Sequence, residues 1–189
     1  MTMRVTDLVK IIIDQKKDAK IAADMTVGKG NDSKYILETT GVERLYGFDI
    51  QKEAEDAAKK LIGEDERFVF YLESHEKIDN YIKEGLDLVV YNLGYLPGGD
   101  KEITTNYKST IKSLEKTLGL MNPDGLIIIT IYPGHPAGKI ESERIEIFLN
   151  NLDSKKYAVM KLAYQNRPNN PPYVMVVKTF TKVSVLPSI

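Results

Sequence analysis

Residues 24–33 read Asp24-Met25-Thr26-Val27-Gly28-Lys29-Gly30-Asn31-Asp32-Ser33. The apolar run Ile21-Ala22-Ala23 precedes this glycine loop, and a helix-like segment follows it. A Gly-x-Gly turn between a strand and a helix lets the backbone approach a ligand closely. Asp49 ends the next strand pattern, where nucleotide-binding folds place the acid that binds ribose. The loop therefore predicts a site for a cofactor that contains adenosine.

The composition of the chain is that of an ordinary globular protein. It has 189 residues, 42% hydrophobic and 28% charged, with a net charge of −1. We expect residues 1–189 to form a single domain. No apolar run reaches the roughly 20 residues of a membrane span and no signal-peptide pattern is seen, so we expect a cytoplasmic protein. The lack of cysteine excludes disulfides and thiolate chemistry. Because the net charge is small, any binding of RNA would depend on local patches of basic residues.

Apolar runs alternate with helical patterns, which predicts an α/β fold: a parallel sheet with helices on both faces. A short loop joins the last two strand patterns, which suits an antiparallel hairpin. A seven-stranded, mostly parallel sheet with a final antiparallel hairpin is the layout of the Rossmann-like class I methyltransferase fold. The expected strands are residues 20–23, 44–48, 67–71, 86–91, 126–131, 157–163 and 173–177, and the expected helices are residues 5–12, 32–40, 52–62, 75–82, 105–120 and 142–152.

Two acids in the glycine loop indicate which adenosine cofactor it holds. Asp24 begins the loop and Asp32 begins the helix, and only Lys29 opposes them. Carboxylates repel the pyrophosphate of a dinucleotide, whereas S-adenosylmethionine carries a sulfonium, an ammonium and no phosphate. Asp24 would lie near this cationic methionyl end, and Asp49 would accept hydrogen bonds from the ribose hydroxyls. The structural alternative is a helix cap at Asn31 or Asp32.

Polar residues also follow the third and fourth strand patterns, at the edge where open α/β sheets bind ligands. Ser74 and His75 follow the third strand, where the sheet would present side chains to the adenine of the cofactor. Ser74 is also a suitable helix cap. Asn92 resembles the first residue of the Asn/Asp-Pro-Pro-aromatic segment of enzymes that methylate amino nitrogens. Its amide would orient an amine and Tyr95 would stack on a base. The alternative is a loop whose aromatic seals the core. The segment reads Tyr91-Asn92-Leu93-Gly94-Tyr95-Leu96-Pro97-Gly98-Gly99-Asp100.

Two later loops complete the candidate site. His135 follows the fifth strand, where it would remove a proton or position the substrate. Arg167 and the amides of the final hairpin loop would contact nucleotide edges or phosphate. The alternatives are a loop histidine without a role and a proline-rigid turn with exposed amides. The two stretches are Tyr132-Pro133-Gly134-His135-Pro136-Ala137-Gly138 and Gln165-Asn166-Arg167-Pro168-Asn169-Asn170-Pro171-Pro172-Tyr173.

Together these segments resemble the YtqB-like family of class I methyltransferases, often described as rRNA methylases and connected with tRNA wobble-uridine methylation. The resemblance covers roughly residues 6–178, and residues 92–100 are its most specific part. Lys29 and Asn31 stand where Asn and His are expected in relatives. The resemblance rests on Asp24-x-Thr26-x-Gly28-x-Gly30-x-Asp32, Phe48-Asp49-Ile50-Gln51, Ser74-His75, Asn92 to Asp100, Tyr132-x-Gly134-His135-Pro136 and Asn169-Asn170-Pro171-Pro172.

The resemblance implies methyl transfer from S-adenosylmethionine to the exocyclic amine of 5-aminomethyl-(2-thio)uridine in tRNA. No metal is expected, since the sulfonium already activates the methyl group. The candidate catalytic residues are Asn92, Tyr95, Asp100 and His135, with Asp100 or His135 assisting proton loss. The candidate cofactor contacts are Asp24, Thr26, Gly28, Lys29, Gly30, Asn31, Asp32, Asp49, Gln51, Ser74, His75 and Asn92. The candidate substrate contacts are Tyr95, Tyr132, Arg167, Asn169 and Asn170.

Other functions stay open at the level of sequence. A methyltransferase for rRNA or for a small-molecule amine would use the same segments. A nucleotide-binding module without catalysis predicts cofactor binding without turnover, and a nicotinamide-dependent oxidoreductase predicts binding of NAD in place of S-adenosylmethionine. The oligomeric state also stays open at the level of sequence. The apolar face of Val5, Leu8, Val9 and Ile12 would cover either the sheet or a second subunit of a homodimer.

Overall fold

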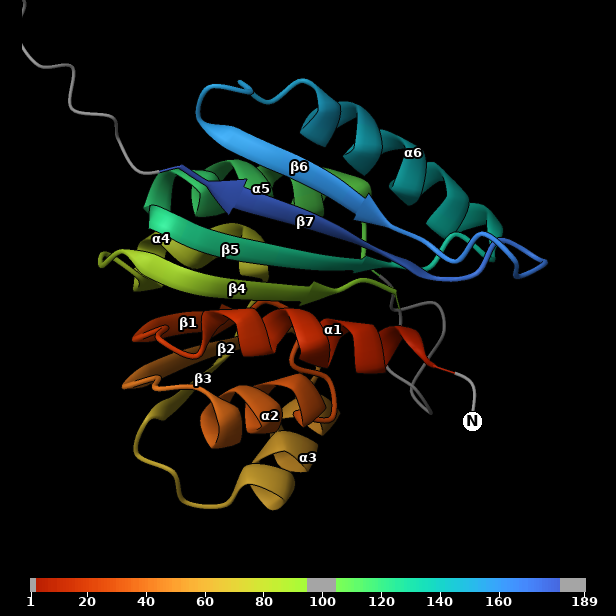
Figure 1. Ribbon diagram of the computed structural model, residues 1–189. Coiled ribbons are helices and arrows are strands. Elements are labelled where there is room, and N and C mark those ends of the chain that lie inside the picture. The colour runs from red at the N-terminus through yellow and green to blue at the C-terminus, as the bar shows by residue number, and fades with distance from the viewer. Residues whose placement is uncertain (1–2, 95–104, 181–189) are drawn as a thin grey trace, which may run out of the picture.

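A computed structural model describes residues 3–94 and 105–180 of the chain. Its centre is a seven-stranded sheet in the order β3-β2-β1-β4-β5-β7-β6 (Figure 1). Strands β1 to β5 pair in parallel, and β7 runs antiparallel to both β5 and β6. The predicted sheet with a final antiparallel hairpin is therefore confirmed. The strands are β1 (Ile21–Asp24), β2 (Arg44–Asp49), β3 (Phe68–Leu72), β4 (Leu86–Asn92), β5 (Met121–Ile131), β6 (Tyr157–Leu162) and β7 (Tyr173–Thr179).

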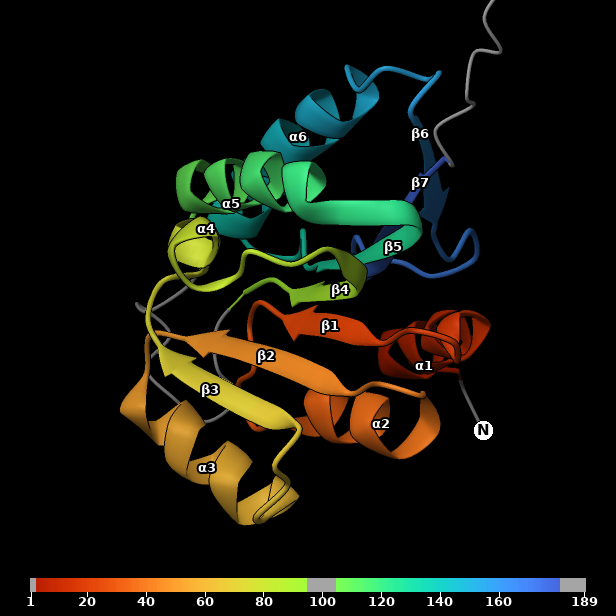
Figure 2. The same ribbon diagram turned by 90° about the vertical axis from the view of Figure 1, so that its left-hand side faces the viewer.

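Helices cover both faces of the sheet (Figure 2). One face carries α1 (Val5–Ile13), α2 (Asn31–Thr39) and α3 (Lys52–Ile62), and the other carries α4 (Ile78–Tyr81), α5 (Tyr107–Leu120) and α6 (Pro136–Asn150). Short 3-10 turns, η1 (Asp14–Lys16) and η2 (His75–Lys77), follow α1 and precede α4. Across the part of the chain that the structure describes, no helix has the length and apolar character needed to cross a membrane.

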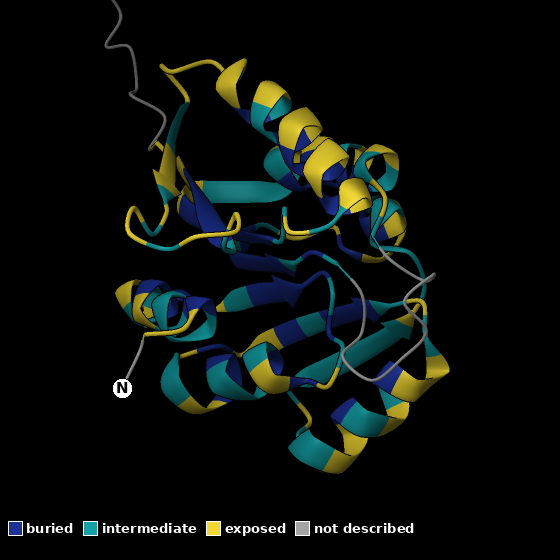
Figure 3. Ribbon diagram, turned by 90° about the vertical axis from the view of Figure 1, so that its right-hand side faces the viewer, coloured by how far each residue is buried: buried dark blue, intermediate teal, exposed yellow. Residues whose placement is uncertain are grey.

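The alternation of side chains along β4 explains why a core forms on each face. Leu88 and Val90 pack toward α1 and α2, whereas Val89 and Tyr91 pack toward α4, α5 and α6. Successive residues of a strand point to opposite faces, so an unbroken apolar run suits a central strand that is covered on both sides. Figure 3 shows these buried central strands between helices whose outer surfaces are exposed.

The start of α6 differs from the prediction. The expected helix began at residue 142, whereas α6 begins at Pro136. Proline suits the first helical position because its missing N–H has no partner there. The His135 Nδ1 accepts a hydrogen bond from the Gly138 N–H at 3.1 Å and caps the new end. Gly138 is needed for close packing, since a Cβ there would lie 2.2 Å from the Tyr132 carbonyl oxygen.

Candidate functional site

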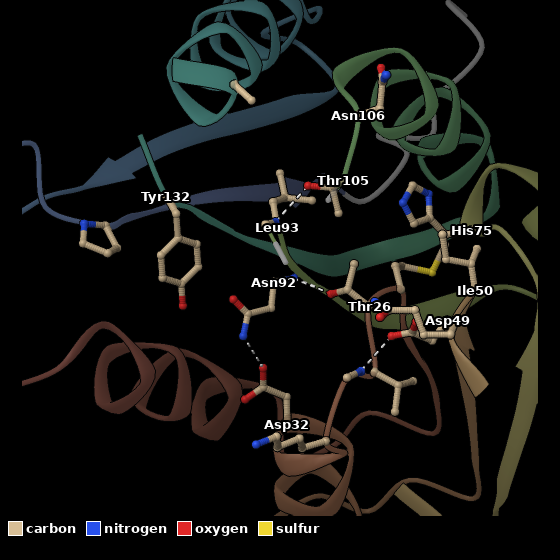
Figure 4. Close-up of a pocket in the computed structure, with 18 of the residues that line it drawn as sticks. Thr26, Asp32, Asp49, Ile50, His75, Asn92, Leu93, Thr105, Asn106 and Tyr132 are labelled. Carbon is tan, nitrogen blue, oxygen red and sulfur yellow. Dashed lines mark hydrogen bonds between the residues drawn. The ribbon is translucent and has the colours of Figure 1, made fainter. Parts of the chain in front are cut away.

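A cavity of about 1250 Å³ opens at the carboxyl ends of the parallel strands (Figure 4). The glycine loop and the residues after β2, β3, β4 and β5 form its walls, and the start of α1, the start of α5 and the β6–β7 loop close it. Pockets for one small molecule usually measure about 300–1,000 Å³. This cavity therefore has room for a second ligand beside a cofactor.

Asp49 joins the glycine loop to the end of β2. Its Oδ2 accepts the Gly28 N–H at 2.9 Å, and its Oδ1 accepts the Gln51 N–H at 3.0 Å. Gly28 has a φ of 52°, a left-handed conformation that glycine adopts without strain. Burial raises the pKa of Asp49, and the backbone donors oppose that rise. The carboxylate is thus held in one orientation on the cavity wall, with lone pairs left for hydroxyl groups of a ligand.

Gly30 has a packing role and does not line the cavity. It precedes the first residue of α2 with a left-handed φ of 81°. A Cβ at this position would lie 3.1 Å from the Cα and 3.2 Å from the Cβ of Ala58 on α3. The second glycine of the loop therefore lets α2 and α3 approach each other, and it is not among the residues that line the cavity.

Asp24 lies beneath the loop and not on the cavity wall. Its side chain is buried, and it accepts hydrogen bonds from the Ser33 Oγ at 2.6 Å and the Thr26 N–H at 3.2 Å. Burial raises its pKa to about 7, and the charge of Asp32 adds to the rise. Asp24, which we expect near the cationic methionyl end, is thus one layer below the wall that Asp32 lines, and it fixes the turn there.

Asp32, Asn92 and Tyr132 form one wall of the cavity (Figure 4). The Asn92 Nδ2 donates to the Asp32 Oδ2 at 3.5 Å, and the Asn92 N–H donates to the Thr26 Oγ1 at 2.6 Å. Burial raises the pKa of Asp32, and burial together with the Asp32 charge raises the pKa of Tyr132. The wall thus combines a carboxylate, an amide and a phenol.

The charged residues that line the cavity favour a cation over a phosphate. Among the described residues that line it, three are acids and one is a lysine, which gives this part of the wall excess negative charge: Asp32, Asp49, Glu73 and Lys29. In a partly buried site this charge attracts a cation and repels an anion more strongly than it would in water. The lining residues therefore fit the sulfonium and ammonium of S-adenosylmethionine better than they fit a dinucleotide.

His75 lies on the opposite side of the cavity from Tyr132 (Figure 4). Its Nδ1 is buried and has no hydrogen-bond partner among the residues that the structure describes. Burial lowers the pKa of His75 to about 4, so the ring is neutral at physiological pH. A buried polar atom without a partner costs free energy unless a ligand satisfies it. His75 lines the cavity, but its Nδ1 is buried, so a ligand there would meet the other atoms of the ring.

His135 lines the cavity and also caps α6. Because its Nδ1 accepts the Gly138 N–H, the neutral ring carries its proton on Nε2. In this tautomer Nε2 carries an N–H that can donate, and it has no lone pair to remove a proton. The geometry therefore favours a positioning role for His135 over proton removal.

The β6–β7 loop brings Asn169 and Asn170 to the cavity, but not Arg167. Both asparagines have a left-handed φ, 62° and 46°, which asparagine tolerates better than most residues. The Arg167 guanidinium stacks on the Tyr164 ring at 3.5 Å and donates a hydrogen bond to the Met3 carbonyl oxygen. Arg167, a predicted substrate contact, thus links this loop to the start of the chain in this structure.

The other predicted residues divide into two groups. Tyr95 and Asp100 lie outside the described residues. Those that the structure brings together on the cavity wall are Thr26, Gly28, Lys29, Asn31, Asp32, Asp49, Gln51, Ser74, His75, Asn92, Tyr132, His135, Asn169 and Asn170. Sequence reasoning missed Thr105, Asn106 and Ser109 at the start of α5. Their position after the fourth strand indicated the carboxyl edge of the sheet, but the sequence does not show which of these side chains face the cavity.

A family model described as "Putative rRNA methylase" matches residues 45–178. The chain belongs to this family. A curated relative from Arabidopsis thaliana, "tRNA (mnm(5)s(2)U34)-methyltransferase, chloroplastic", is 33% identical over 178 residues, which cover 87% of this chain. The chain spans 64% of the length of that relative.

Solved structures of other proteins share this fold. A protein of Clostridium thermocellum described as an rRNA methylase superposes with a TM-score of 0.90 at 30% identity, covering 95% of this chain and 100% of the other. A Streptococcus mutans protein described as a methyltransferase, in complex with S-adenosylhomocysteine (SAH), gives a TM-score of 0.86 at 26% identity over the same shares. These two solved structures confirm the class I methyltransferase fold.

Proposed function

We propose that this protein is an S-adenosylmethionine-dependent methyltransferase that methylates the 5-aminomethyl group of wobble (2-thio)uridine in tRNA. The acidic cavity at the strand ends carries the proposal of methyl transfer, since it fits a cationic cofactor. The choice of substrate is supported by the Arabidopsis relative, which is named for the methylation of this nucleoside. A methyltransferase for rRNA is the second candidate, because the family model is described by that activity.

The cavity residues divide between the cofactor and the substrate. Asp49 would accept hydrogen bonds from the ribose hydroxyls, Asp32 would face the cationic methionyl end, and His75 would contact adenine. Bound S-adenosylmethionine supplies an activated methyl group on a sulfonium. Tyr132 and the β6–β7 loop then form the part of the cavity that remains for the target nucleotide, where an aromatic face stacks well on a base.

Asn92, on the cavity wall at the end of β4, is the residue that would orient the substrate amine. Its Nδ2 is engaged by Asp32, so its carbonyl oxygen is the end of the amide that accepts from a primary amine. The amine attacks as the neutral base: a nitrogen–carbon bond forms, the carbon–sulfur bond breaks with its electron pair kept by sulfur, and the product ammonium later releases a proton. The contribution of the protein is alignment at near-attack distance, which is worth several kcal/mol of the barrier.

A methyl-transfer assay with purified protein tests the proposal. The protein is incubated with radiolabelled S-adenosylmethionine and either tRNA that carries 5-aminomethyl-2-thiouridine, rRNA or small amines. Label in that tRNA nucleoside alone supports the proposal, and label in rRNA alone favours the second candidate. We expect Asn92→Ala to lower kcat by about tenfold or more with little change in cofactor affinity. Asn80→Ala, on the exposed side of α4, is the matched control. Full activity of Asn92→Ala would contradict the role given to Asn92.

Nucleoside mass spectrometry of tRNA from cells that lack the protein gives an independent test. The proposal expects 5-aminomethyl-2-thiouridine to accumulate while its methylated form disappears. An unchanged nucleoside profile would count against the tRNA substrate, even if the purified protein binds S-adenosylmethionine.

A further inference from the structure

Three successive backbone N–H groups at the end of β4 each have a threonine as partner. The Asn92 N–H donates to the Thr26 Oγ1 at 2.6 Å, and the Leu93 N–H donates to the Thr130 carbonyl oxygen at 3.0 Å. The Gly94 N–H donates to the Thr105 Oγ1 at 2.8 Å. Thr26 belongs to the glycine loop and Thr130 to β5, whereas Thr105 lies in the segment before α5 (Figure 4). The direction in which the chain leaves Asn92 therefore depends on Thr105.

Thr105 is fixed by a buried carboxylate on α6. Its hydroxyl donates to the Glu141 Oε2 at 2.9 Å, and its N–H donates to the Gly94 carbonyl oxygen at 2.9 Å. Glu141 is only 6% exposed, and its Oε1 accepts from the Thr110 hydroxyl at 3.2 Å. A buried carboxylate is costly unless hydrogen bonds satisfy it. Glu141 does not line the cavity, so it has no direct access to a ligand there.

The single proton of the Thr105 hydroxyl explains what Glu141 does. A hydroxyl has one O–H and two lone pairs. Because Glu141 takes the O–H, the Thr105 oxygen can only accept from Gly94. Without Glu141 the hydroxyl is free to rotate, and it can turn its proton toward the Gly94 N–H. Gly94 has a φ of 126°, which a residue with a side chain rarely adopts. The hydrogen bonds to Thr105 therefore hold a turn that depends on glycine at this position.

We propose that Glu141 is a positioning residue for Asn92, which it holds in place through Thr105 and Gly94. The inference rests on the proposed methyl transfer, in which the orientation of Asn92 determines the alignment of the substrate amine. Thr110 gives a way to separate this role from ordinary packing. Its hydroxyl ties α5 to Glu141 but does not extend to Gly94.

The experiment compares Glu141→Ala, Glu141→Gln and Thr110→Val in the full chain. The rate of amide hydrogen exchange at Gly94, followed by NMR in the free protein, measures how firmly the Gly94 N–H is held by Thr105. Steady-state kinetics of tRNA methylation give kcat and KM. Glutamine keeps an oxygen that accepts from Thr105 and an amide that can donate to Thr110, so it is the conservative variant. Thr110→Val loses only the branch to α5 and serves as the control for stability.

We expect Glu141→Ala to speed exchange at Gly94 by about tenfold and to lower kcat by about tenfold, with KM for S-adenosylmethionine unchanged. Glu141→Gln should restore both quantities, and Thr110→Val should leave both near the values of the unmodified protein. Equal exchange at Gly94 in Glu141→Ala and Thr110→Val would overturn the inference, and so would equal losses of kcat. If the unmodified protein methylates no tRNA, the proposed function fails, while the exchange measurement still decides whether Glu141 holds Gly94.

Discussion

At the scale of single residues, the three aspartates around the glycine loop have different surroundings. Asp49 and Asp32 line the cavity, whereas Asp24 is buried beneath it. Asp24 and Asp49 both accept backbone N–H groups, which shape the loop, and all three have raised pKa values because burial disfavours their charge. The same residue type therefore lines the cavity in one place and is a buried structural acceptor in another.

Asp49→Asn should weaken binding of SAH by about tenfold or more. The asparagine keeps one acceptor for the Gly28 or Gln51 N–H but loses the charge, and a hydrogen bond to a charged group is worth roughly 1.5–3 kcal/mol. Isothermal titration calorimetry measures the change in Kd. Asp56→Asn, an exposed position on α3 whose partner is Lys52, is the matched control. Equal affinities in the two variants would argue against a ligand contact at Asp49.

The raised pKa of Asp24 predicts how stability depends on pH. In the folded protein Asp24 holds its proton up to about pH 7, and in the unfolded chain only to about its ordinary value of 3.8. Between these values the folded state binds more protons, so the free energy of unfolding falls as the pH rises. The side chain of Asp24→Asn is uncharged at every pH, so the variant should lack the contribution of Asp24 to the decrease in unfolding free energy. That contribution amounts to about 1.4 kcal/mol per unit of pKa shift.

Urea unfolding of both proteins at pH 5 and pH 8 measures the effect of Asp24. Other titrating groups are common to the two proteins, so the difference between their pH profiles reports Asp24. Parallel profiles would mean that Asp24 is charged in the folded state at both pH values.

At the scale of elements, the contact between α2 and α3 depends on the absence of a side chain at Gly30. Gly30→Ala should lower the free energy of unfolding by about 1–3 kcal/mol, because the left-handed φ strains alanine and its Cβ crowds Ala58. Ala58→Gly in the same chain removes one of the two crowding atoms. Chemical unfolding of the two single variants and the double variant forms a thermodynamic cycle.

That cycle should show favourable coupling, with the double variant less destabilised than the sum of the single ones. Additive losses would indicate that backbone strain alone accounts for Gly30→Ala. In either case the Kd for SAH should change less than in Asp49→Asn, because Gly30 does not line the cavity.

At the scale of the whole molecule, the cavity exists only when the strands are assembled. Its walls come from the ends of β1 to β5, the start of α1 and the β6–β7 loop. A ligand that binds only the folded state stabilises it by about 2.7 kcal/mol at 100 times its Kd. SAH should therefore raise the unfolding free energy, and NAD at the same concentration should not. Stabilisation by NAD alone would point to an oxidoreductase, in conflict with the acidic wall.

The sequence indicated every strand of the sheet and the final hairpin, and the boundaries of α3 coincide with those expected, Lys52–Ile62. Strand and helix periodicities are local, so they are visible in short stretches of sequence. It also indicated which strand ends carry polar groups, since these follow apolar runs directly. The earlier start of α6 had a signal in the sequence, since Pro136 suits the first helical position, but His135 is an unusual helix cap.

Tertiary structure alone decided which polar residue does what. Glu141 meets Thr105 across 36 positions of the chain, and Arg167 meets Met3 across 164. Asp24 looked like a ligand contact by its place in the loop, yet Ser33 and Thr26 engage it beneath the surface. Burial and hydrogen-bond geometry arise from packing between distant segments. The sequence by itself therefore determined the fold and the edge of the sheet that carries the site, and the packing decided the role of each side chain there.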